Sequence, residues 1–132
     1  VEIQISAKAR GFHIITDQVV RELGDLPSIG ILNLFIKHTS AGLTINENAD
    51  PSVRVDFESI FNKLVPENES FHTHVLEGAD DMPAHVKASI VGTSIQIPIT
   101  GGNLSLGTWQ GIYLCEFRDH GGSRKLIATI IS

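Results

Sequence analysis

Residues 29–38, IGILNLFIKH, decide how the rest of the chain is arranged. The side chains alternate between two faces, with Leu32, Leu34 and Ile36 on one side and Ile31, Asn33 and Phe35 on the other. Because both faces are largely apolar, the run predicts a central β-strand that is covered on both sides. By the same alternation His38 falls on the face of Leu32, at the end of the strand, where open sheets tend to hold their binding sites.

Shorter patterns on either side of this strand predict a mixture of strands and helices. We predict strands at residues 1–6, 12–15, 94–100, 104–106, 111–118 and 125–131, and helices at 17–23, 51–65 and 81–91. Thr16 and Asp50 are expected N-caps, and Pro51 suits a first helical position. Pro98 places its strand at a sheet edge, and the last two strands predict a meander. The order predicts one α+β domain over residues 1–132, with a mostly antiparallel sheet and about three helices.

Composition narrows the classes of function. A chain of 132 residues fits one domain, and a net charge of -5 excludes a general attraction to nucleic acid or anionic membranes. Cys115 is the only cysteine, which suits a cytoplasmic protein without disulfides. The sequence has no long apolar run and no secretory leader, so we expect no membrane span. Since Val1 is not a methionine, we expect natural residues before it or processing.

A histidine-rich stretch, FHTHVLEGADDMPAHVKASIVG, occupies residues 71–92. Its titratable residues are His72, His74, Glu77, Asp80, Asp81 and His85. Imidazoles and carboxylates bind divalent metals and also move protons. The alternative is a polar surface loop followed by a helix cap. Asp80 and Asp81 are adjacent and cannot point the same way, so one is expected to cap the helix while the other faces the site.

Two metal sites are compatible with this stretch. His74 and His85, together with His38 from the distant strand end, would give three ligands and leave a position for water. The rival is an oxygen-rich magnesium site built from Glu77, Asp80 or Glu116.

Polar residues elsewhere suggest a pocket for a small molecule. Thr39 and Ser40 either supply a nucleophile or cap a turn and bind a ligand. Trp109 lies between two glycines in GTWQG, residues 107–111, and either stacks on a heterocycle or joins the core. Glu116 and Arg118 share a strand face, as a pocket mouth or as an ion pair. For phosphate, the candidate groups are Lys87, Arg118, Arg124 and the backbone amides of residues 81–85.

Three ordered motifs resemble the YjbQ family of small uncharacterised proteins. They are HTSAGLTINENADPSV at 38–53, HVLEGADDMPAHVKASIVG at 74–92 and LSLGTWQGIYLCEFRDHGGSRK at 104–125. The resemblance implies a compact α+β fold of sandwiched sheets. It also implies a homotrimer whose sheets pack around the threefold axis, with a polar pocket near a subunit boundary.

The resemblance also implies an activity, because some family members carry a secondary thiamine phosphate synthase activity. It makes His38, His74 and His85 the expected ligands of a divalent metal, zinc or alternatively magnesium. We expect catalytic roles for Asp81, Glu116 and Arg118, and substrate-binding roles for Thr39, Ser40, Asn46, Asn48, Thr108, Trp109 and Gln110. His72 lies outside the family pattern, and Phe117 stands where a histidine often occurs.

These patterns together predict a metal-binding enzyme that acts weakly, as a thiamine-phosphate synthase does, on a phosphorylated heterocycle. Its class would be a transferase or a metal-dependent hydrolase. The alternative is a non-catalytic homo-oligomer that binds a metabolite or regulates another process.

Overall fold

The computed structural model describes residues 1–132, which form eight strands and three helices. In chain order these are β1 (Glu2–Ile5), β2 (Gly11–Ile14), α1 (Thr16–Leu23), β3 (Ile29–Ile36), β4 (Ala41–Glu47), α2 (Pro51–Leu64), α3 (Asp81–Val91), β5 (Ser94–Thr100), β6 (Asn103–Leu104), β7 (Gln110–Glu116) and β8 (Arg124–Ile131). The predicted α+β class is therefore correct. None of the helices has the length and apolar character that a membrane span requires.

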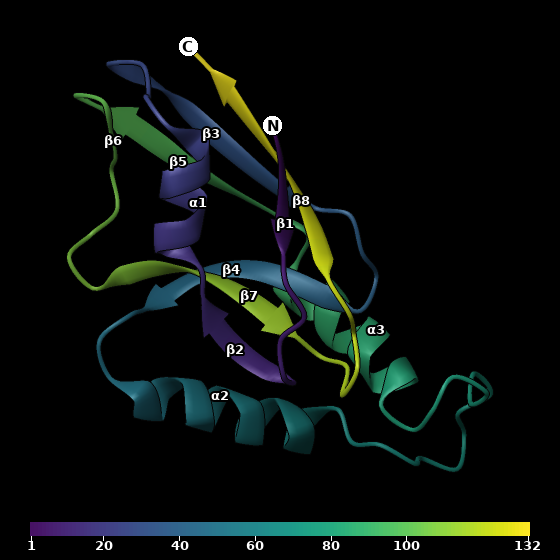
Figure 1. Ribbon diagram of the computed structural model, residues 1–132. Helices are drawn as coiled ribbons and strands as arrows, with labels where there is room; N and C mark the ends of the chain where they lie inside the picture. The colour runs from purple at the N-terminus through teal and green to yellow at the C-terminus, as the bar shows by residue number, and fades with distance from the viewer.

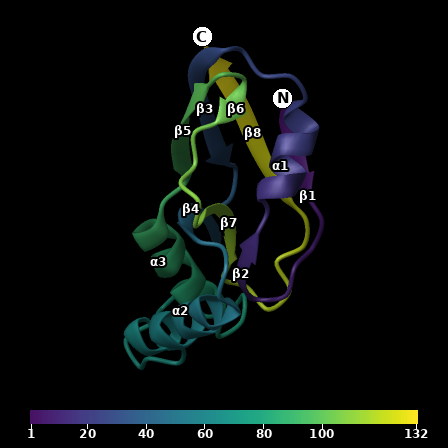
Figure 2. The same ribbon diagram turned by 90° about the vertical axis from the view of Figure 1, so that its left-hand side faces the viewer.

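The strands form two curled sheets, and every strand pairing is antiparallel. One sheet has the order β1-β8-β3-β5-β6 and the other the order β2-β7-β4. Figure 1 shows the three-stranded sheet below the larger one, with α2 under it and α3 at its side. Figure 2 shows α1 at the opposite side of the molecule from α3.

Two apolar clusters hold the layers together. The larger one lies between the sheets and includes Leu32, Leu34, Ile36, Leu43, Ile112, Leu114 and Val19 of α1. The smaller one includes Phe12, Tyr113, Cys115, Phe117, Ala84 and Ala88, and packs against Phe57 and Phe61 of α2. Since successive residues of β7 enter different clusters, β7 is the strand that is covered on both faces.

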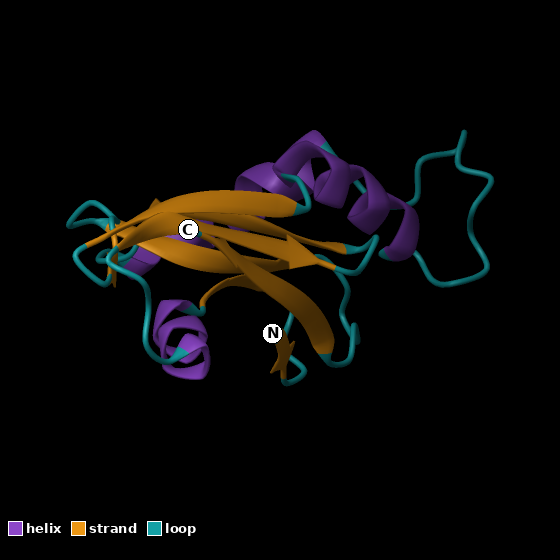
Figure 3. Ribbon diagram, turned by 90° about the horizontal axis from the view of Figure 1, so that it is seen from above, coloured by secondary structure: helices purple, strands orange, loops and turns teal.

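The prediction that β3 is covered on both sides is wrong within one chain. Leu32, Leu34 and Ile36 are buried, but the opposite face is open to solvent. Ile29 is 75% exposed, and Ile31 and Phe35 are each 43% exposed. No helix of the chain covers this face of the larger sheet, as the views in Figures 1 and 3 agree.

The predicted meander of the last two strands is also wrong, because β7 and β8 belong to different sheets. The predicted edge position of Pro98 holds for most of β5, since β6 pairs only with Ile99 and Thr100. An unpredicted strand, β4, pairs along its full length with β7. Gly42 lets the end of α3 approach this strand, because a Cβ there would lie 2.9 Å from the carbonyl oxygen of Gly92.

The three helices begin within one residue of their predicted starts, but only one has its expected cap, and Thr16 is the first residue of α1 and not its N-cap. The carboxylate of Asp50 accepts a hydrogen bond from the backbone nitrogen of Ser52 at 2.9 Å. The hydroxyl of Thr16 instead accepts from the backbone nitrogen of Ile112, also at 2.9 Å. Asp81 makes no capping bond to its helix, because its carboxylate faces two histidines and an arginine.

Candidate metal centre

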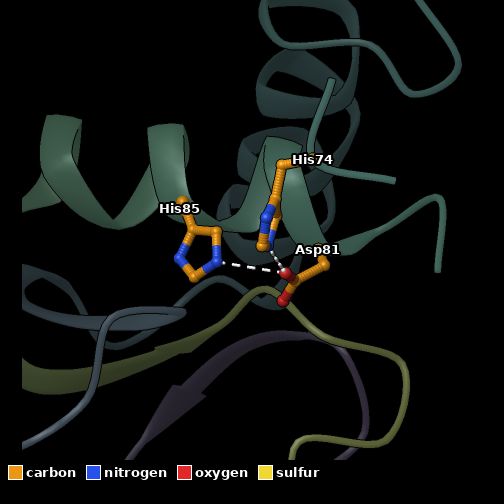
Figure 4. Close-up of side chains that lie close together, drawn as sticks. All are labelled: His74, Asp81 and His85. Carbon is orange, nitrogen blue, oxygen red and sulfur yellow. Dashed lines mark hydrogen bonds and ion pairs between the residues drawn. The ribbon is translucent and has the colours of Figure 1, made fainter. Parts of the chain in front are cut away.

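His74, Asp81 and His85 bring their side chains together at the start of α3. One ligand atom from each lies within 4.8 Å of the others. Asp81 and His85 are four residues apart, so one face of the helix carries both. His74 comes from the long loop between α2 and α3, which extends away from the body of the molecule in Figures 1 and 3. Figure 4 shows both imidazoles directed at the Asp81 carboxylate.

A single oxygen of Asp81 faces both rings. Its Oδ2 lies 2.7 Å from Nε2 of His74 and 3.1 Å from Nε2 of His85. The Asp81 side chain is only 5% exposed, whereas that of His74 is 49% exposed and that of His85 is 31% exposed. The carboxylate is therefore buried beneath two imidazoles that solvent and small molecules can reach.

The backbone decides which nitrogen of His85 carries a proton. Nδ1 of His85 lies 3.0 Å from the carbonyl oxygen of Thr39, which can only accept a hydrogen bond. Nδ1 therefore carries a proton, and in the neutral ring Nε2 is the nitrogen whose lone pair faces Asp81 Oδ2. Two lone pairs facing each other need a proton or a cation between them. A backbone carbonyl that fixes the tautomer in this way is typical of metal-binding histidines.

Arg118 holds the Asp81 carboxylate from behind. Its Nη1 donates to Asp81 Oδ1 at 2.8 Å and its Nε donates to Asp80 Oδ2 at 2.8 Å. Burial opposes ionisation of Asp81, but hydrogen bonding by His74 and the positive charge of Arg118 outweigh it, so the pKa of Asp81 is lowered. Because its guanidinium is already bound to two carboxylates, Arg118 orients the candidate metal ligand Asp81 and is not free to bind a phosphate.

His38 does not join this cluster. Its Nε2 accepts a hydrogen bond from the backbone nitrogen of Lys125 at 2.8 Å, beyond the end of β3. Burial and the charge of Arg124 lower the pKa of His38, which favours the neutral ring that this bond requires. His38, Thr39 and His85 nevertheless line one pocket of about 210 Å³. Of the three predicted ligands the structure thus brings together two, and it places Asp81 with them instead of His38.

Glu116 lies behind the cluster and is fully buried at the end of β7. Its Oε1 accepts from Nε of Arg124 at 2.7 Å, and Nη2 of Arg124 also donates to the Ser40 hydroxyl at 3.1 Å. Glu116 therefore has no access to a substrate, and the predicted catalytic role does not fit its position. Ser40, itself 8% exposed, is likewise occupied by Arg124. From the sequence, Arg124 is predicted only as a phosphate-binding group, because a buried arginine in an apolar strand has no local signature.

The other predicted substrate-binding residues lie at the far end of the β4–β7 ladder. Ala41 pairs with Glu116 at the histidine end, and Glu47 pairs with Gln110 at the opposite end. The intervening six steps correspond to about 20 Å. Asn46, Asn48, Thr108, Trp109 and Gln110 gather at this second end. Within one chain, therefore, the candidate metal ligands and these predicted substrate-binding residues lie far apart.

The polar residues at this second end bond mainly to one another and to the neighbouring backbone. Asn48 Nδ2 donates to the carbonyl oxygen of Gln110 at 3.1 Å, and Gln110 Oε1 accepts from the backbone nitrogen of Gly107 at 2.8 Å. Trp109 is 64% exposed and lies outside both apolar clusters, so its ring is available to a ligand or to another chain.

A pocket of about 280 Å³ opens beside the cluster on the side of His74. Its lining residues are Asn68, Glu69, His72, His74, Val75, Gly78, Ala79 and Met82. His72 thus contributes to the wall of this pocket but lies outside the group of three ligand atoms. The pocket gives a small molecule room to approach the cluster directly.

The donor atoms suit zinc better than magnesium. Two imidazole nitrogens and one carboxylate oxygen form a common catalytic zinc set, whereas magnesium requires mainly oxygen ligands. Around zinc at ~2.1 Å these atoms would stand about 3.4 Å apart, so each ring must move away from the Asp81 oxygen by less than about 1 Å. The magnesium site predicted from Glu77, Asp80 or Glu116 does not assemble, because Arg118 binds Asp80 and Arg124 binds Glu116.

The three helices and the two curled antiparallel sheets define a small single-domain α+β protein, and the histidine–carboxylate cluster is its candidate metal centre. The family model described as "UPF0047 protein YjbQ-like" matches residues 1–132, and the chain belongs to this family. It is 52% identical over 130 residues to UPF0047 protein YjbQ from Escherichia coli O157:H7. The aligned residues cover 97% of this chain and 94% of the relative. It is 54% identical over 130 residues, with the same coverage, to the protein of that name from Salmonella typhimurium.

Solved structures share the fold. The conserved hypothetical protein TT1486 from Thermus thermophilus superposes with a TM-score of 0.88 at 32% identity, covering 99% of each chain. An uncharacterised YjbQ/UPF0047 protein from Clostridium acetobutylicum gives a TM-score of 0.85 at 42% identity, again over 99% of each chain. The resemblance noted in the three sequence motifs is thus confirmed over the whole chain.

Proposed function

We propose that the protein is a metal-dependent enzyme that binds one divalent cation of the zinc type at His74, Asp81 and His85. The observation that carries this proposal is the hydrogen bond from His85 to the Thr39 carbonyl, since it places a proton on Nδ1 and leaves Nε2, beside Asp81, as the nitrogen that can bind a cation. The exposed rings of His74 and His85 leave room for water or a substrate oxygen. When bound, such a cation would act as a Lewis acid and neutralise the charge of a leaving group.

The proposed substrate is a small phosphorylated heterocycle, in a reaction of the thiamine-phosphate synthase type. The basic residues near the cluster divide into two groups. Arg118, Arg124 and Lys87 are occupied by protein partners. Lys37 and Lys125 are exposed, flank His38 and make no ion pair. These two lysines are the groups proposed to meet the phosphate, next to the pocket that His38 shares with His85.

A homotrimer would complete this site. The exposed apolar face of β3 and β8, with Ile29, Ile31, Phe35 and Ile131, supports burial against other copies. The exposed Trp109 end of one subunit would then lie over the histidine cluster of the next, where the ring stacks on the heterocycle. Mixed oligomers test this arrangement. His85→Ala and Trp109→Ala subunits, each inactive alone, are expected to recover activity when they are refolded together.

Metal analysis tests the proposal directly. Protein purified without an affinity tag is expected to carry about one zinc-type ion per chain, and His74→Ala and His85→Ala are expected to carry almost none. His120→Ala serves as the control, because His120 is exposed and makes no hydrogen bond with a side chain or the backbone. Equal metal content in all four proteins would remove the ligand assignment.

A non-catalytic, metabolite-binding homo-oligomer is the second candidate. It is favoured by the position of Ser40, whose buried hydroxyl is bound to Arg124 and is therefore not available as a nucleophile. Complementation of a thiamine auxotroph separates the candidates. Growth with the wild-type protein and with His120→Ala, but not with His85→Ala, supports catalysis. Equal growth with all three, at matched protein levels, supports the binding role.

A further inference from the structure

Glu116 is buried away from the candidate metal centre, but hydrogen bonds connect it to two of the metal-binding side chains. The carboxylate is fully buried, and Arg124 is bound to it through Nε and Nη2. The pair joins the end of β7 to the start of β8, which lie in different sheets. From this pair, two separate chains of hydrogen bonds lead to the metal-binding side chains.

The first chain leads to His85. Nη2 of Arg124 donates to the Ser40 hydroxyl at 3.1 Å and to the Ser40 carbonyl oxygen at 3.4 Å. The preceding residue, Thr39, accepts the Nδ1 proton of His85 at 3.0 Å. Arg124 thus fixes the peptide segment whose carbonyl selects the His85 tautomer.

The second chain leads to Asp81. Oε2 of Glu116 accepts from the backbone nitrogen of Arg118 at 3.2 Å. The side chain of Arg118 in turn donates to Asp81 Oδ1 at 2.8 Å. One buried carboxylate therefore anchors the supporting groups of two of the three ligands.

We propose that Glu116 is a positioning residue, which orients His85 through Arg124 and residues 39–40 and orients Asp81 through Arg118. This inference rests on the proposed metal site. Partners behind metal ligands typically change metal affinity 10- to 100-fold when they are removed. A carboxylate that serves only to hold two sheets together would affect folding and leave metal affinity unchanged.

Gly121 offers a way to disturb the Glu116–Arg124 pair without deleting a charge. A Cβ at Gly121 would lie 2.5 Å from Oε1 of Glu116 and 2.6 Å from Nη2 of Arg124. The chain thus passes directly over the ion pair, and Gly121→Ala forces the Glu116 and Arg124 side-chain ends and the loop at residue 121 apart. Gly122 is the matched control, because its Cβ would meet nothing within 4 Å, although its φ of +71° makes Gly122→Ala strained.

The experiment compares wild type, Glu116→Gln, Gly121→Ala and Gly122→Ala. Zinc affinity is measured by competition with a chelator, and Co²⁺ substitution reports ligand geometry in the visible spectrum. We expect Glu116→Gln and Gly121→Ala to bind zinc 10- to 100-fold more weakly than wild type, with an altered Co²⁺ spectrum. Gly122→Ala is expected to melt at a lower temperature but to keep the wild-type affinity and spectrum.

Nitrogen NMR of the His85 ring in metal-free protein gives a second readout, which holds even if the wild type binds no metal. We expect Nδ1 to carry the proton in wild type and Gly122→Ala, and this preference to be lost in Gly121→Ala. Absence of metal from wild type with a preserved tautomer difference would remove the proposed function and keep the positioning role. Wild-type affinity and tautomer in Gly121→Ala overturn the positioning role, even if Glu116→Gln does not fold.

Discussion

Nε2 of His38 lies 2.8 Å from the backbone nitrogen of Lys125 and accepts its hydrogen bond. The two residues are 87 positions apart, and the bond ties the segment after β3 to the start of β8. Because the acceptor is a ring nitrogen, the bond exists only while His38 is neutral. A residue predicted as a metal ligand thus contributes a contact between distant parts of the chain.

This bond predicts a pH dependence of stability. The pKa of His38 is lowered by burial and by Arg124, so between the folded pKa and about 6.5 the unfolded chain binds more protons. The stability from neutral His38 is therefore fully present above pH ~6.5 and is lost as pH falls through the folded pKa. His38→Gln, which offers an acceptor that does not titrate, is expected to reduce this loss. Urea unfolding between pH 8 and 5 measures it, and parallel curves for both proteins would contradict the prediction.

Arg118 neutralises two adjacent carboxylates, so Arg118→Met is expected to destabilise the fold. The replacement leaves Asp80 and Asp81 without their cation, at a cost of roughly 2 kcal/mol at pH 7 for a partly exposed pair. The pKa values of both carboxyls are lowered in the folded state, so wild type loses this stability as pH falls below about 4. The difference between the two proteins should therefore shrink in acid. Urea unfolding at pH 7 and 3.5 checks this, with the surface variant Arg21→Met as control.

The sequence predicted most elements because their apolar periodicity is local. Alternation indicated β1, β3 and β5, and the Asp50–Pro51 pair indicated the start of α2. The same patterns do not reveal which sheet a strand joins, so β7 and β8 were predicted as a meander. β4 was missed because Gly42 resembles a turn residue, although its missing Cβ is what admits the end of α3.

The candidate site was predictable where it depends on residue chemistry and not where it depends on long-range contacts. His74 and His85 stand out by side-chain type and spacing. The role of Asp81 is ambiguous in the sequence, since an aspartate at a helix start is usually a cap. The engagement of Glu116 by Arg124, and of His38 by a backbone amide, arises only when β7, β8 and the end of β3 come together.

Lys87 is a buried cation whose removal is expected to leave the fold intact. It is 1% exposed, and its Nζ donates to Asn62 Oδ1 at 2.6 Å, an oxygen that Arg10 also uses at 2.6 Å. Burial, followed by the charge of Arg10, lowers the pKa of Lys87. Lys87→Met keeps the apolar stem and removes the disfavoured charge, so we expect equal or higher stability at pH 7.

The pH dependence of Lys87→Met gives a sharper comparison. Between its lowered folded pKa and about 10.4, wild type gains stability as pH rises, because the unfolded chain binds more protons there. The advantage of the variant should therefore be larger at pH 7 than at pH 9.5. Urea unfolding at both values measures it, with the exposed Lys63→Met as control. A loss of about 2 kcal/mol or more at pH 7 would mean that the ammonium is needed for packing.

The exposed apolar side chains on the outer face of β3 lead to a prediction about how point mutations change assembly. Ile31 and Phe35 face away from the core, so a lysine at either position costs little in the folded chain but cannot be buried against another copy. If the proposed trimer forms through this face, Ile31→Lys and Phe35→Lys are expected to shift the mass measured by light scattering from that of a trimer to that of a monomer, with little change in circular dichroism. Val55→Lys, at an exposed apolar position on α2, is the control and should keep the wild-type mass. If all three variants have the mass of wild type, the subunits meet through another surface, and the Trp109 end of one chain does not reach its neighbour by this route.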